Sequence, residues 1–155
     1  MTRARVLRGI AIVAVLLMAS MTTGCFKTEI TISISPDELV CAEAEPFDGT
    51  ITVEMVGWLA GGVYDTLTVE FFGAEDQELL DEAIVIEDLW ISVSPVNKVA
   101  TAELLDLEGL VAPAELWDEA LGFVGKEAKF TLTSTGMNVK LNPLTCTVGL
   151  KDLTE

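Results

Sequence analysis

From residue 29 onward, polar and apolar residues alternate with a period of two. Residues 28–35 place an isoleucine at every second position and stop before Pro36, and residues 50–55 and 66–71 repeat the pattern. Alternate side chains of a strand point to opposite faces, and β-branched residues favour strands. The alternation therefore predicts a chain made mostly of half-buried β-strands.

Further segments of the same kind follow, separated by turn residues. They span residues 83–86, 89–93, 99–104, 126–133 and 137–150. Short strands with a turn signal about every 8–12 residues are typical of two-sheet β-sandwiches and of β-barrels. We predict a single antiparallel β-sandwich domain over residues 29–155.

One segment departs from the period of two. Residues 113–122 begin with Pro113, carry Glu115 in the first turn and end at Gly122. Proline at the first helical position, an early acid and a closing glycine are signals of a helix. This segment predicts one short helix that crosses over between late strands.

The first 25 residues have the pattern of an export signal. Arg3, Arg5 and Arg8 precede the apolar run 10–18, and the small and polar residues 19–24 follow it. The apolar run is too short to span a membrane, which takes about 20 residues. We predict an N-terminal signal helix.

The end of this signal, Thr22-Thr23-Gly24-Cys25, resembles the lipobox of bacterial lipoproteins, with Thr22 where that family usually has leucine. The resemblance implies that residues 1–24 are removed and that Cys25 becomes the lipidated first residue. Residues 25–28 would then be a tether of roughly 10 Å. The mature protein would be extracytoplasmic and bound to a membrane by its N-terminal lipid. The alternative is an ordinary signal peptide or an uncleaved anchor, with Cys25 an incidental thiol.

The charge of the chain excludes several functions. Its 155 residues contain 25 acids, nine bases and no histidine, and only six bases, all lysines, follow Cys25. Nucleic-acid binding requires clustered bases, so we expect no nucleic-acid partner. Histidine is the usual proton carrier at neutral pH and the commonest metal ligand. We therefore expect no catalytic residue and no cofactor.

The two other cysteines are Cys41 and Cys146, near the two ends of the domain. Two cysteines in an exported chain make one disulfide, and no CxxC motif or histidine favours a redox or zinc role. We predict a structural disulfide between them.

Three further groups of residues are candidates for binding. The acidic stretch that includes Glu75, Asp76 and Glu78 is a weak calcium candidate, and a solvated hairpin end is the simpler interpretation. The apolar stretch 56–64, with Trp58, Leu59 and Tyr64, is a candidate partner-binding loop; its alternative is a bulged strand end that caps the core. The other tryptophans, Trp90 and Trp117, are expected to pack between elements.

Residues 30–56 resemble the opening of bacterial immunoglobulin-like domains, and residues 67–80 are similar to the middle of small envelope sandwiches of the FxLYD type. This resemblance implies an immunoglobulin-like fold and carries over no catalytic residue. Together with the lipobox, it predicts a non-catalytic, membrane-anchored module that binds or scaffolds another envelope protein. Two alternatives stay open: a lipoprotein that binds a small ligand or calcium through acidic loops, and a small hydrolase.

Overall fold

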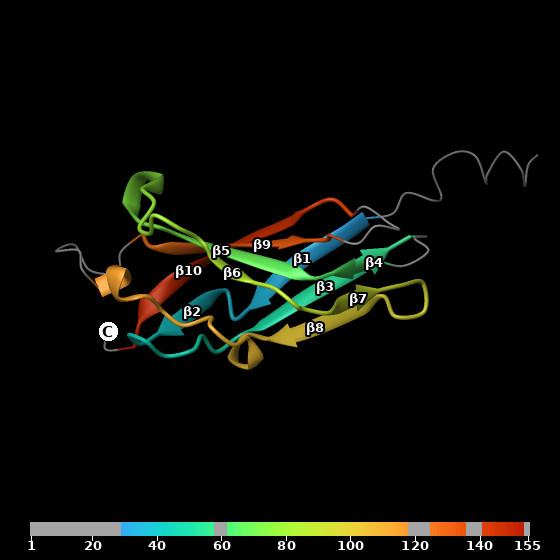
Figure 1. Cartoon of the computed structure of the whole chain (residues 1–155), viewed down its shortest axis with the longest axis horizontal. Coiled ribbons are helices and arrows are strands. Elements are labelled where there is room, and N and C mark those ends of the chain that lie inside the picture. The colour runs from blue at the N-terminus through green and yellow to red at the C-terminus, as the bar shows by residue number, and fades with distance from the viewer. Residues whose placement is uncertain (1–28, 58–61, 118–124, 136–140, 154–155) are drawn as a thin grey trace, which may run out of the picture.

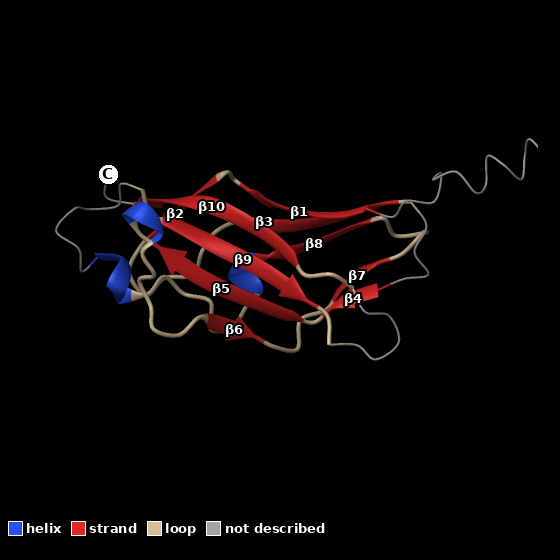
Figure 2. Cartoon of the chain, turned by 90° about the horizontal axis from the view of Figure 1, so that it is seen from above, coloured by secondary structure: helices blue, strands red, loops and turns tan. Residues whose placement is uncertain are grey.

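The structure, a computed structural model of the chain, describes residues 29–57, 62–117, 125–135 and 141–153. The predicted signal helix and the tether, residues 1–28, lie outside these ranges. The described residues are mostly in β-strands, with three short 3-10 helices (Figures 1 and 2). The mostly β fold predicted from the alternation is therefore confirmed.

The strands form two main sheets and one small one. The three-stranded sheet has the order β1 (Glu29–Ser35), β3 (Thr50–Val56) and β8 (Val99–Glu103). The five-stranded sheet has the order β2 (Glu38–Cys41), β10 (Leu144–Asp152), β9 (Glu127–Thr133), β5 (Thr66–Phe72) and β6 (Ile84–Ile86). The small sheet pairs β4 (Gly62–Tyr64) with β7 (Ile91–Val93).

The inner faces of the two main sheets supply one hydrophobic core, which is consistent with a β-sandwich. Val53 of the three-stranded sheet and Phe130 of the five-stranded sheet are both fully buried. Between the strands, Phe47 stacks on Phe71 with ring centroids 5.9 Å apart. Along β5 and β9, buried positions alternate with partly exposed ones, as the period of two predicts.

The expectation of a purely antiparallel sandwich is wrong in one place, because β2 pairs in parallel with β10. The sequence analysis missed β2 and gave β4 only within the alternative of a bulged strand end over 56–64; these strands have only four and three residues. The strand expected over 137–150 begins at Leu144, and residues 137–140 of that prediction lie outside the described residues.

The helix expected over 113–122 is described only as a 3-10 helix, Ala114–Trp117. The rest of that segment, 118–122, lies outside the described residues. Its place in the chain is as predicted, because it lies on the crossover from β8 in one main sheet to β9 in the other. The two other 3-10 helices are Ala74–Asp76 and Leu104–Asp106.

The two ends of this elongated domain are referred to below as the entry end and the far end. At the entry end β1 begins, β3 ends and β8 begins, since Glu29 pairs with Val56 and Glu54 pairs with Val99. At the far end β2 and β10 end, where Cys41 pairs with Asp152. The entry end is on the right of Figure 1 and the far end, with the C-terminus, on the left.

Candidate functional site

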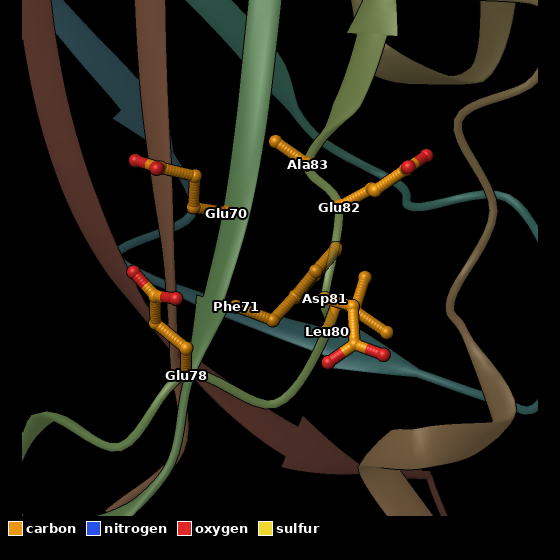
Figure 3. Close-up of a pocket in the computed structure, with 7 residues that line it drawn as sticks. All are labelled: Glu70, Phe71, Glu78, Leu80, Asp81, Glu82 and Ala83. Carbon is orange, nitrogen blue, oxygen red and sulfur yellow. The ribbon is translucent and has the colours of Figure 1, made fainter.

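The acidic stretch after β5 does not gather its carboxylates around one point. Glu75 and Asp76 lie in an exposed 3-10 helix, both with positive φ. Glu78 lines a shallow depression of about 70 Å³ that also contains Glu70 and Glu82. In Figure 3 the carboxylates of Glu70 and Glu78 lie on one side of the depression and that of Glu82 points to the other.

This arrangement gives no support to the calcium alternative. A calcium ion takes six to eight oxygen ligands that converge on it. Among the described residues, no group of three or more acidic, cysteine or histidine side chains is placed to hold a metal ion. The contact that does form here is an ion pair between Lys129 Nζ and Glu70 Oε2 at 3.9 Å, half exposed to solvent.

The candidate partner-binding stretch is divided by the structure. Tyr64 is fully buried in β4, and its hydroxyl donates a hydrogen bond to the carbonyl of Asn142 at 3.4 Å. Burial raises the pKa of this phenol. A side chain without exposed surface cannot contact a partner, so the proposed contact role of Tyr64 is wrong. Trp58 and Leu59 lie outside the described residues.

The two other tryptophans differ from each other. Trp117 is partly buried and packs against the core, as expected. Trp90 is 77% exposed, which contradicts the expectation that it packs between elements. It lies just before β7, between the inward-facing Leu89 and Ile91, and its indole points into solvent.

The predicted disulfide is not present, because both Cys41 and Cys146 are free thiols. The parallel pairing of β2 with β10 explains this result. Cys41 lies beside Asp152, six positions beyond Cys146 along the same strand, which corresponds to about 20 Å. Disulfide formation requires Cα atoms within about 7 Å. The sequence analysis placed both cysteines near the ends of the domain but, because it missed β2, could not give their register.

A polar cluster that the sequence analysis missed lies in the core at the far end. Lys126 is only 2% exposed, and its ammonium group donates a hydrogen bond to the carbonyl of Leu116. The amide of Leu150 donates to the carbonyl of Lys126 at 3.0 Å, which places Lys126 opposite Leu150. Asp152 follows two positions later on the same inward face of β10 and pairs with Cys41.

The thiol of Cys41 belongs to the same cluster. It donates a hydrogen bond to the carbonyl of Lys151 at 3.3 Å. Burial raises the pKa of this thiol to about 11; the negative charge of Asp152 raises it further and the positive charge of Lys126 opposes the shift. The thiol is therefore protonated at neutral pH, and the nucleophilic thiolate is not populated.

The sequence contained a signal for this cluster. The inward positions of β9 are Ala128, Phe130 and Leu132, and the same parity places Lys126 inside. A lysine is almost never fully buried unless it has partners. A lysine at an inward position of a strand therefore predicts a polar cluster around it.

No described segment forms a helix long and apolar enough to cross a membrane. Neither a scan against protein-family models nor a search of curated proteins found a match to this chain.

Proposed function

We propose that this protein is a lipoprotein of the cell envelope, anchored to a membrane through Cys25, whose β-domain is a non-catalytic binding or scaffolding module. The observation that carries this proposal is the position of the first strand. β1 begins at Glu29, so three residues separate it from Cys25. In a tethered envelope protein, the folded domain is expected to begin directly after a leader that is first basic, then apolar, and ends in Gly-Cys.

The proposal includes an immunoglobulin-like fold for the domain. The order β1-β3-β8 matches strands A, B and E of that fold, and β10-β9-β5-β6 matches G, F, C and C′. The crossover from β8 to β9 matches the passage from E in one sheet to F in the other. The parallel strand β2 and the small sheet of β4 and β7 are additions to this scheme.

The outward faces of the sheets support a binding or scaffolding role over catalysis. One row of hydroxyls crosses the three-stranded sheet through Ser33, Thr52 and Thr101. Another crosses the five-stranded sheet through Thr68, Thr131 and Thr145. Such faces offer flat hydrogen-bonding area to a partner, whereas catalytic sites are concave.

Mass spectrometry of the mature protein from a membrane fraction tests the anchor. We expect an N-terminal peptide that begins at Cys25 and carries acyl chains, and we expect Cys25→Ser to leave the protein unacylated and without a mature N-terminus at position 25. Cys146→Ser is the matched control, because it also removes a cysteine but leaves the lipobox intact. A mature N-terminus at another residue, or Cys25 without acyl mass, would overturn the proposal.

The partner is tested by crosslinking in intact cells followed by pull-down. We expect one envelope protein to be enriched, and we expect replacement of exposed hydroxyls by lysine, as in Thr101→Lys, to reduce that enrichment. Enrichment that is the same for the variant would exclude the hydroxyl face of the three-stranded sheet as the contact.

A further inference from the structure

Three valines are exposed together at the entry end. Val56 is 61% exposed at the end of β3, Val99 is 48% exposed at the start of β8, and Val96 is 98% exposed in the turn between β7 and β8. The turn is closed by hydrogen bonds between Ser94 and Asn97. Its central position therefore points into solvent, where turns usually carry polar residues or glycine.

These valines belong to one continuous surface. The amide of Met55 donates to the carbonyl of Lys98 at 2.7 Å, so the end of β3 lies directly beside the turn. Val99 pairs with Glu54 on the outward face of the same sheet. Elsewhere that face carries serine, threonine and glutamate, so its exposed apolar residues are confined to the entry end.

The charge of the domain also differs between its two ends, and the entry end, which carries the exposed valines, is the less acidic one. The described residues that join strands at the entry end, 57, 94–98, 134–135 and 141–143, contain no acid and one lysine, Lys98. The described acids near this end are Glu29 and Glu54 on the strands, the hydrogen-bonded Asp65, and Glu87 and Asp88 in the segment before β7, where the amide of Leu89 donates to the carbonyl of Asp65. Acids are dense on the described loops and strand ends toward the far end: Glu43, Glu45, Glu75, Asp76, Glu78, Glu115, Glu127 and Asp152.

We propose that the entry end docks on the surface of the lipid bilayer, with Val56, Val96 and Val99 in contact with the lipid and Lys98 beside the phosphate groups. The proposal rests on the lipid anchor proposed above. The described chain begins at this end with Glu29, and a tether of roughly 10 Å from Cys25 holds the valines close to the bilayer.

Charge and apolar area agree with this orientation. A negatively charged membrane repels the acidic far end, which stands outward, over a Debye length of about 8 Å. Glu29 and Glu54 oppose docking, and the attraction of Lys98 to phosphate offsets part of their effect. The three valines leave water on docking, and the far end remains available to a partner.

The experiment uses the full-length, acylated protein in vesicles of phosphatidylethanolamine and phosphatidylglycerol. Asn97→Cys, in a background without Cys41 and Cys146, carries an NBD label beside Val96, and Glu115→Cys carries the same label at the far end. We expect vesicles to shift the emission of the label at position 97 to the blue and to slow its reduction by dithionite severalfold. The label at position 115 should be reduced by dithionite at the same rate in the presence of vesicles as in buffer without vesicles or detergent.

Valine variants test the contact itself. Val56→Glu with Val96→Glu, in the protein labelled at position 97, should lower the ratio of docked to free domains by about tenfold or more and restore reduction by dithionite. Val40→Glu with Val85→Glu is the matched control, because these valines are 44% and 52% exposed on other strands. Circular dichroism verifies that each variant is folded.

The outcomes separate the two proposals. A protein that is acylated and bound to vesicles, but whose label at position 97 is fully open to dithionite, overturns docking and leaves the anchor intact. A protein that is not acylated overturns the anchor. Equal loss of protection in both pairs of valine variants would also overturn docking, because the effect would then not depend on the entry end.

Discussion

The two ends of the domain break the same alternation in opposite ways. At the far end, Lys126 and Asp152 occupy inward positions among apolar residues, whereas at the entry end Val56 and Val99 occupy outward positions among polar ones. A buried charge is costly unless it has partners, whereas an exposed valine costs little by itself. The far-end exceptions are therefore held by contacts within the chain, and the entry-end exceptions are explained by a contact outside it.

Replacement of Lys126 should have the largest effect, because it tests the interior contacts of the far end. We expect Lys126→Ala to reduce the free energy of unfolding by about 2–4 kcal/mol, since it leaves a cavity and a carbonyl without its donor. Lys126→Met keeps most of the apolar stem and should lose about 1–2 kcal/mol. Urea unfolding monitored by tryptophan fluorescence measures both. If the methionine variant is as stable as the natural protein, the ammonium group is not required and the contrast between the ends fails.

Gly62 provides the corresponding test of packing at the entry end. A Cβ atom at this position would lie 2.5 Å from Leu141 Cδ1 and 2.9 Å from Leu141 Cγ. Because Leu141 is itself buried, it cannot move away freely, and Gly62→Ala should cost about 1–3 kcal/mol.

Gly149→Ala in β10 is the matched control for Gly62→Ala. The nearest atom to a Cβ there is Glu38 Cγ at 3.8 Å, an ordinary contact, so we expect a change within about 0.5 kcal/mol. Thermal unfolding followed by circular dichroism compares the two variants. Equal melting temperatures for both would show that the entry end is loosely packed.

The main strands could be predicted because their alternation is local information. β1, β3, β5 and β9 begin and end within one or two residues of the predicted limits. β2 could not be predicted, because it has only four residues, begins two positions after Pro36 and is held by pairing with β10, more than a hundred residues away. The same non-local pairing separates Cys41 from Cys146. The burial of Lys126 was predictable because it lies an even number of residues from the inward positions of β9, and the outward position of Trp90 was predictable from the inward-facing apolar residues on either side of it.

The far end should also respond to alkaline pH through Cys41. Burial raises the pKa of this thiol from 9.0 to about 11 in the folded protein. As the pH rises above 9 the unfolded chain loses the thiol proton while the folded chain keeps it, so stability is lost between about pH 9 and pH 11. Cys41→Ala should remove this part of the pH dependence. Urea unfolding at a series of pH values measures it, and a difference between the two proteins that does not change with pH would contradict it.

The smallest effect is expected at the entry end under acidic conditions. Asp65 accepts hydrogen bonds from the hydroxyl and amide of Thr135 and from the hydroxyl of Thr66, and the bond from the Thr135 hydroxyl is the main cause that lowers the pKa of this carboxyl. Because the folded state favours the ionised form, its contribution to stability is complete above the ordinary value of 3.8 and disappears as the pH falls through the lowered pKa. NMR titration of the carboxyl measures this pKa directly. Thr135→Val should return it toward its ordinary value, and an unchanged pKa in that variant would show that the strand corner at Asp65 is held by other contacts.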